Sequence, residues 1–271
     1  MVDAPQSKAP RAWEPLTPVG VAGFASARIS RLWLVQALVA LVCAAAVVWF
    51  VHHCWFPVVG EAISKAPASG VVRLGLLHWY GESPVLLAEN SFLAIGVDIN
   101  NSGQARSPAD VHFELQERRI MVRSLHGASF EPYPRRTIIA ANRTELQPWW
   151  GAWAPAILAV LAAATICWLM VSWFGLASVY CLPAWLLAFF MNRQLTISGA
   201  WKLCGAALLP AALALSAGVM AYGLGLLNPI AFLLIFATHF VVGWAYVLAA
   251  IWMSPRYPGS PGSRKNPFAG G

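Results

Sequence analysis

Acidic residues are scarce in this sequence, and its C-terminal part has none. Only 11 of the 271 residues are Asp or Glu, and none follows Glu145. Charged residues make up 11% of the chain, whereas soluble globular domains usually carry about 25%. The region after Glu145 is therefore not a soluble enzyme domain, and it excludes any intramembrane mechanism that needs a carboxylate. Its basic residues are Arg193, Lys202, Arg256, Arg264 and Lys265.

The stretch between residues 55 and 148 has no cysteine, and the sequence lacks the common catalytic motifs. None of the five cysteines lies between residues 55 and 148, which excludes a disulfide framework there. The sequence has no Walker loop, no G-x-S-x-G elbow and no H-E-x-x-H motif. His52, His53 and Cys54 are metal-ligand types, but successive helical side chains point about 100° apart, so they indicate a polar boundary. The predictions are no enzymatic activity, no metal and no cofactor.

Apolar residues dominate what is present. The hydrophobic fraction is 59%, and the mean hydropathy is +0.61. Residues 33–51 form a first apolar segment, which is long enough at about 1.5 Å per residue to cross a hydrocarbon core of about 30 Å. Residues 1–32, rich in Ala, Pro and Arg, are expected to be a disordered tail. The chain is therefore predicted to be an integral membrane protein.

A second apolar region, residues 149–253, is predicted to form a C-terminal bundle. Its first 43 residues are about twice the length of one crossing, so they are expected to divide near residues 173–175. Thr196 or Ser198 can cap the following helix, and Asn228-Pro229 can open the last one. The predicted segments are 150–173, 175–191, 201–227 and 229–253, followed by a disordered tail over 254–271.

Residues 56–147 differ from both apolar regions and are predicted to form a small β-rich soluble domain. Nine acidic and nine basic residues lie among short apolar runs. Apolar and polar residues alternate over 111–122, which predicts a hairpin with its turn near Glu117 and Arg118. The runs 71–79 and 85–99 are also typical of strands, and the polar residues 100–103 supply a turn.

The basic residues that flank the segments bear on topology. Arg28 and Arg31 precede the first segment, which favours a cytoplasmic N-terminus and an extracytoplasmic domain. Five crossings would then place Arg256 outside, against the same rule. Either the run 149–191 crosses only once, or the N-terminus is outside and the domain cytoplasmic. We favour the extracytoplasmic domain, because the first segment usually dominates.

His239 is the candidate for chemistry inside the bundle. An ionisable side chain at membrane depth is a functional candidate by default. Gly243 and Tyr246 share its helix face, and Tyr222 on the preceding segment completes a candidate ligand site with His239 and Tyr246. The alternative interpretation is a neutral imidazole that packs against a neighbouring helix.

Several short motifs resemble a group of bacterial polytopic membrane proteins, some of them labelled maltodextrin-utilisation proteins. The resemblance covers about residues 30–253 and implies a bacterial cell membrane, with an accessory role in sugar uptake. It carries no catalytic residue to this chain. The motifs are Ala109-Asp110-Val111, Arg123-Ser124-Leu125-His126-Gly127, Tyr133-Pro134, Pro148-Trp149-Trp150-Gly151-Ala152-Trp153 and the segment Leu195 to Pro210.

The predicted fold is thus an α-helical transmembrane bundle of four to five apolar segments, with a small β-rich domain inserted after the first span. The predicted function is a non-enzymatic anchor in the bacterial inner membrane, whose extracytoplasmic domain binds a partner or an envelope ligand. The alternative is a component or accessory of a membrane transporter with a cavity near His239. The expected partners are the lipid bilayer and a protein that contacts residues 56–147. Nucleic acid is not expected, because the basic residues flank apolar segments.

Overall fold

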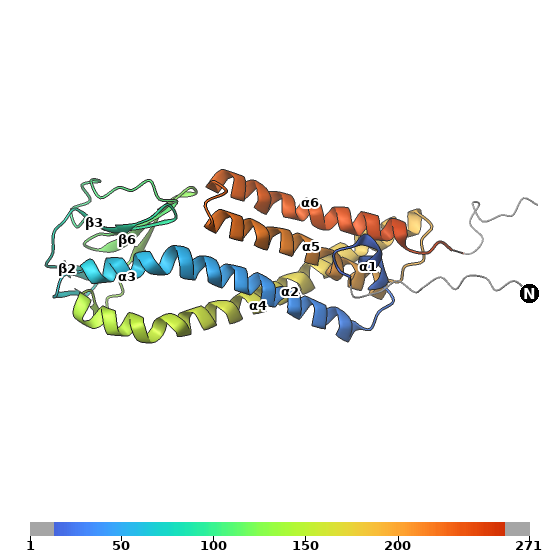
Figure 1. Ribbon diagram of the computed structural model, residues 1–271, viewed down its shortest axis with the longest axis horizontal. Coiled ribbons are helices and arrows are strands. Elements are labelled where there is room, and N and C mark those ends of the chain that lie inside the picture. The colour runs from blue at the N-terminus through green and yellow to red at the C-terminus, as the bar shows by residue number, and fades with distance from the viewer. Residues whose placement is uncertain (1–13, 258–271) are drawn as a thin grey trace, which may run out of the picture. The chain divides into compact units, whose positions relative to one another are not determined.

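A computed structural model describes residues 14–257 of the chain (Figure 1). The chain divides into two compact units, each assembled from separate stretches of sequence. The described part of the first unit comprises residues 14–46, 163–219 and 230–257. The second unit comprises residues 47–162 and 220–229. The predicted tails over residues 1–13 and 258–271 lie outside the described residues.

Within residues 14–257, four helices are long and apolar enough to cross a membrane, which is the composition of a multi-pass membrane protein. The first candidate span is continuous from α2 (Ile29–Phe50) through one π-helical turn (Val51–Trp55) into α3 (Phe56–Lys65). The remaining three are α4 (Arg143–Phe190), α5 (Ile197–Gly223) and α6 (Pro229–Met253).

The predicted division of residues 149–191 into two segments is wrong. α4 is one uninterrupted helix of 48 residues, about 72 Å long at 1.5 Å per residue. A single Gly175 does not end it, because glycine inside a helix costs only about 1 kcal/mol relative to alanine. Its residues 143–162 belong to the second unit, so one helix serves both units.

Other helix boundaries also differ from the predictions. The predicted first segment, 33–51, begins at Ile29, and residues 56–65, which we assigned to the β-rich domain, continue it as α3. Part of the predicted tail 1–32 is helical and forms α1 (Pro18–Gly23). Thr17 caps this helix, because its Oγ1 accepts a hydrogen bond from Gly20 N at 3.1 Å. Likewise Thr196 Oγ1 accepts from Gly199 N at 3.0 Å at the start of α5.

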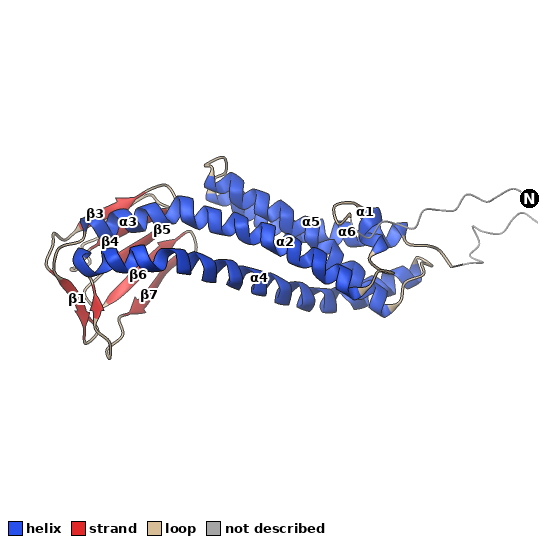
Figure 2. Cartoon of the chain, turned by 60° about the horizontal axis from the view of Figure 1, so that its bottom comes forward, coloured by secondary structure: helices blue, strands red, loops and turns tan. Residues whose placement is uncertain are grey.

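The strands of the second unit form two sheets, visible in Figure 2. The predicted hairpin is confirmed: Leu115 pairs with Ile120, so Glu117 and Arg118 lie in the turn. The runs 71–79 and 85–99 each fold into two strands. We call residues 66–142 the β-domain. Its sheets have the orders β2-β1-β8 and β3-β4-β5-β6-β7, and the strands are β1 (Gly70–Arg73), β2 (Leu76–Trp79), β3 (Val85–Glu89), β4 (Leu93–Val97), β5 (Val111–Leu115), β6 (Arg119–Ser124), β7 (Gly127–Pro132) and β8 (Ile139–Ala140).

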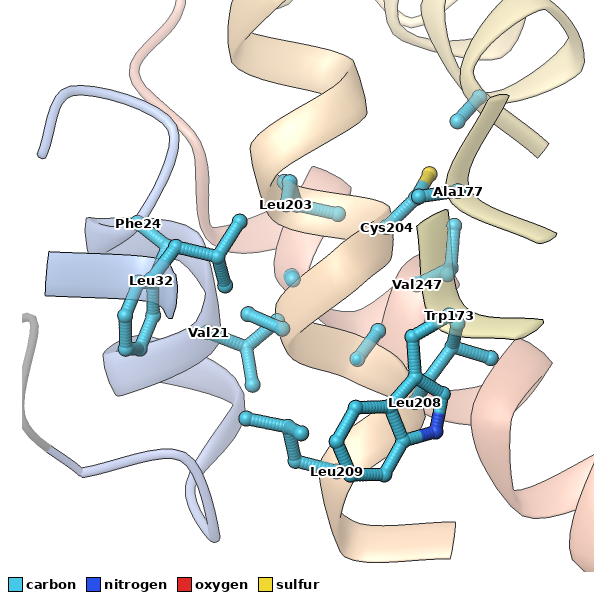
Figure 3. Close-up of a cluster of buried hydrophobic side chains, with 14 of the residues drawn as sticks. Val21, Phe24, Leu32, Trp173, Ala177, Leu203, Cys204, Leu208, Leu209 and Val247 are labelled. Carbon is cyan, nitrogen blue, oxygen red and sulfur yellow. The ribbon is translucent and has the colours of Figure 1, made fainter. Parts of the chain in front are cut away.

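The core of the first unit forms around α5, which runs beside α6 in both views (Figures 1 and 2). Leu203, Cys204 and Leu209 of α5 are fully buried, and Figure 3 shows them among side chains from α1, α2, α4 and α6. Gly205 leaves room for Gln36 of α2, whose Nε2 donates to the Gly205 carbonyl at 3.3 Å. Small residues thus allow the close helix packing that membrane bundles use.

The core of the second unit joins α3 to the five-stranded sheet. Val58 and Ala62 of α3 are buried against Leu87, Leu93 and Val97 of β3 and β4. A smaller cluster forms around Val72, Leu77 and Tyr133. Because α3 continues α2, the β-domain packs directly on the C-terminal end of the first candidate span.

Candidate functional site

Within the second unit, the end of α5 is bound to the β-domain by Tyr222. Its hydroxyl donates a hydrogen bond to the Asp110 carboxylate. Its ring lies 5.5 Å from that of Phe50 and 5.1 Å from that of Phe92, measured between centroids. The Asn90 side-chain amide also donates to the Cys54 carbonyl at 2.6 Å. Polar and aromatic contacts together hold these helix ends to the strands.

Beside Tyr222 lies a cleft of mixed polar and apolar lining, made of two adjoining cavities of about 720 Å³ and 280 Å³. The two share Asp110 and Pro229 in their walls, and Glu89 lines the larger one. The Glu89 carboxylate accepts a hydrogen bond from the Ser107 hydroxyl at 2.6 Å. Over residues 14–257 there is no group of three or more His, Cys, Asp or Glu placed to hold a metal ion.

Side chains of β5 and β6 and of the turn between them form a network around the buried Glu114 carboxylate. Glu114 on β5 is fully buried; its Oε1 accepts from Gln116 Nε2 at 2.7 Å, and its Oε2 lies 3.2 Å from Arg123 Nη2. Gln116 Oε1 in turn accepts from Arg119 Nε at 2.8 Å. The buried Glu114 carboxylate thus faces the positive charge of Arg123, which offsets the cost of burying it.

Asp98 anchors the turn that follows β4. Its carboxylate is fully buried and accepts hydrogen bonds from Ser102 N at 2.9 Å and Gly103 N at 2.7 Å. Burial by itself raises the pKa of Asp98, but these hydrogen bonds and the charge of Arg123 outweigh it and hold the pKa below its usual value. The carboxylate therefore stays ionised and, through these hydrogen bonds, fixes the turn at the start of the loop between β4 and β5.

His112 predicts a loss of stability in acid. Burial lowers its pKa and outweighs the opposing charges of Glu114 and Glu89, while Arg123 lowers it further. The unfolded chain, with a pKa of about 6.5, therefore binds a proton that the folded β-domain does not. Stability should fall as pH drops below that value.

Pulse proteolysis in urea at about pH 7.5 and pH 5.5 would measure this loss, and His112→Gln should reduce the difference between the two. An equal pH response in the variant would show that His112 is not its source.

A third cavity is almost entirely apolar. It measures about 310 Å³, at the lower end of the range of about 300–1,000 Å³ that is typical of ligand pockets. α3, the start of α4 and strands of both sheets contribute to its walls. The side chains around it include Val59, Ile63, Val72, Leu77, Trp79, Leu87, Leu115, Ile120, Tyr133, Ile139, Ala140 and Leu146.

Tyr133 contributes a buried polar side chain to this wall, whereas Glu131 is exposed. The side chain of Tyr133 has 8% exposure, and its hydroxyl has no hydrogen-bond partner among the described residues. Burial raises the pKa of this phenol, so it stays protonated and able to donate. A buried hydroxyl without a partner costs free energy.

The sequence-predicted site residues each have separate partners. His239 Nδ1 contacts the Phe236 carbonyl of its own helix, and the Tyr246 hydroxyl donates to the Leu16 carbonyl at 2.8 Å. Tyr222 belongs to the second unit and lines the larger cavity of its cleft. None of the three cavities described above is lined by His239 or Tyr246.

Sequence reasoning missed the residues that the structure brings into prominence. Glu114 alternates with apolar neighbours, which is the pattern of a solvent-facing position, yet it is fully buried. Tyr133 lies in a Pro-rich segment typical of a surface loop, and no periodicity indicated its burial. Only an isolated aromatic residue between two prolines could have served as a signal there.

Comparison with known protein families, curated proteins and solved structures finds no match to this chain. The resemblance to bacterial polytopic membrane proteins therefore stays a prediction, and so does the sugar-uptake role that it implies.

Proposed function

We propose that the chain is a non-enzymatic membrane anchor that presents its β-domain outside the cytoplasm, where the domain binds a partner or an envelope ligand. Two features support this proposal. One is the distribution of positive charge over the helix ends. The other is the set of contacts that binds the β-domain to helices within the second unit.

The distribution of charge is the observation that carries the orientation. If each of the four long helices crosses once, the residues before α2, between α4 and α5 and after α6 share one side. Arg28, Arg31, Arg193 and Arg256 all belong to these segments. The turn between α5 and α6, residues 224–228, has no charged residue. Because basic flanks favour the cytoplasm, the β-domain and this turn are extracytoplasmic.

Contacts within the first unit agree with this grouping. Backbone hydrogen bonds join Gln194 N to the Pro255 carbonyl at 2.8 Å and Tyr257 N to the Asn192 carbonyl at 3.3 Å. Lys202 Nζ donates to the Ala27 carbonyl at 2.7 Å. The three basic helix ends therefore meet, as four crossings require. Five crossings would place Arg31 and Arg256 on opposite sides of the membrane, whereas four crossings place both on the cytoplasmic side.

Rigid attachment supports a presenting role for the helices. Tyr222 holds Asp110 at the start of β5, and α3 packs against the five-stranded sheet. Within the second unit the β-domain is thus held to helix ends, as suits a binding module displayed by membrane helices.

Single-cysteine labelling tests the orientation. The five native cysteines would be replaced, and His126→Cys, Leu226→Cys and Gln194→Cys introduced singly, all at exposed positions. A membrane-impermeant maleimide added to intact cells should label residues 126 and 226 only, and should reach residue 194 after the cells are opened. Labelling of residue 126 from the cytoplasm alone would overturn the proposal.

A further inference from the structure

The outer side of β7 is an open sheet edge. β7 is the last strand in the order β3-β4-β5-β6-β7, and no other strand of residues 14–257 pairs with it. It pairs with β6 without interruption from Gly127 to Pro132, and every residue of this strand is exposed. At the other end of the same sheet, a β-bulge interrupts β3 between Leu86 and Ala88. Bulges protect a sheet edge against pairing with further strands, and β7 has none.

The register fixes which main-chain groups this edge offers. Tyr133 N donates to the Arg118 carbonyl at 3.4 Å, so the amide of Tyr133 faces β6. Amides alternate between the two sides of an antiparallel strand. The amides and carbonyls of Ala128 and Phe130 therefore face away from β6. Pro132 has the next outward position, where a residue without an N–H is tolerated. A further strand would find donors and acceptors two residues apart.

A positive charge lies over the exposed side chain of this edge. Phe130 is 48% exposed, and Arg119 Cζ lies 4.1 Å from the centroid of its ring. Arg119 Nε donates to Gln116 Oε1, and Arg119 forms no ion pair with a carboxylate of the described residues. Glu131 points to the other face of the sheet, because successive side chains of a strand alternate. An added strand therefore meets uncompensated positive charge on the face of Phe130.

A second copy of the chain does not fit this edge. Two copies of β7 would pair antiparallel about a two-fold axis perpendicular to the sheet. Since α3 packs along one face of this sheet, the same rotation would reverse the direction of α3 in the second copy. Because α3 continues α2, the two first candidate spans would then run in opposite directions. Two chains inserted with one orientation in a bilayer cannot pair in this way.

We propose that β7 binds an extended segment of a partner protein, which adds to the sheet as an antiparallel strand. The main chain of the segment pairs with Ala128 and Phe130, and an acidic side chain on the face of Phe130 contacts Arg119. This inference rests on the proposed binding role of the β-domain and names the place where the partner binds. It does not depend on which side of the membrane the β-domain faces.

Binding of a synthetic peptide to the full chain in detergent micelles tests the site. The probe is a fluorescein-labelled peptide, Thr-Val-Thr-Glu-Thr-Val-Thr, whose Val and Glu side chains share one face when it is extended. Fluorescence anisotropy should show saturable binding. Peptide residues opposite Ala128 and Phe130 share the face of Phe130 and turn their amides towards β7. Methylating the Val and Glu amide nitrogens should therefore weaken binding at least about tenfold, whereas methylating the central Thr nitrogens should leave it unchanged.

Variants of the chain test the same contacts. Ala128→Pro removes one outward N–H and should weaken binding about three- to tenfold. Ala128→Ser keeps the N–H and is the matched control. Because this N–H does not face β6, Ala128→Pro should stay as resistant to protease as the unchanged chain, and the methylated peptides test the same pairing without any change to the fold. Arg119→Gln should weaken binding of the probe about two- to fivefold, but not binding of a peptide with Gln in place of Glu.

Several results would overturn the proposal. These are no saturable binding up to about 1 mM peptide, equal effects of the two methylation patterns, and binding insensitive to Ala128→Pro. A dimer of the full chain that Ala128→Pro dissociates would show that a second copy occupies the edge instead. Equal binding of the Glu and Gln peptides would refute the contact with Arg119. Cytoplasmic labelling of residue 126 with intact peptide binding would refute only the proposed orientation, so the two failures are distinguishable.

Discussion

Glu114→Ala is expected to lower the free energy of unfolding of the β-domain by about 3 kcal/mol, because it strands a partly buried charge. The change removes the partner of Arg123 Nη2 at 3.2 Å and the acceptor of Gln116 Nε2 at 2.7 Å. The loss stays at the lower end of the range of about 3–5 kcal/mol for such pairs, since the Arg123 side chain is 29% exposed and partly solvated.

Pulse proteolysis of the full chain in urea would measure this loss, because the protease cleaves only the unfolded fraction. Glu117→Ala is the control. Its Oε2 lies 3.8 Å from Arg118 Nε in an exposed pair, and its removal should change stability by less than about 0.5 kcal/mol. Equal losses in the two variants would show that the buried network contributes no more than a surface pair.

Leu93→Ala is expected to cost the β-domain about 3 kcal/mol. Leu93 on β4 is 2% exposed, in the cluster that joins the sheet to α3. Truncation loses the transfer of its side chain out of water and leaves a cavity, and each contributes to the loss. The midpoint of urea-induced proteolysis should therefore fall.

Leu203→Ala provides the comparison from the bundle. Leu203 is fully buried in the first unit, but the helices of an unfolded bundle remain in lipid, which is as apolar as leucine. The substitution should lose packing alone and cost less than Leu93→Ala. Unfolding of the bundle by sodium dodecyl sulfate would measure it. A loss as large as that of Leu93→Ala would show that Leu203 meets water when the bundle unfolds.

Much of the architecture follows from local pattern. The apolar runs predicted helices in the regions of α2, α5 and α6, and alternation over 111–122 predicted the β5–β6 hairpin. Thr196 was one of two capping residues that the pattern offered, and it caps α5. These features depend on neighbours in sequence, which explains why sequence alone could predict them.

Other features depend on contacts between distant residues. Whether residues 149–191 form one helix or two was ambiguous, because a lone glycine inside an apolar run is compatible with both. Residues 56–65 were assigned to the β-domain because they begin after a polar boundary at His52 and His53, but a π-helical turn carries the helix through it. His239 and Tyr246 were grouped by helix face and Tyr222 was added from the preceding segment, yet each has its own partner.

The sequence by itself determined the apolar stretches long enough to span a membrane and the strand-rich insert between them, because hydropathy and periodicity are properties of short stretches of chain. The tertiary structure alone decided that Glu114 is buried beside Arg123 and that the Tyr133 hydroxyl is buried without a hydrogen-bond partner among the described residues. Burial of a single side chain depends on what the rest of the fold places around it, and no local pattern records that.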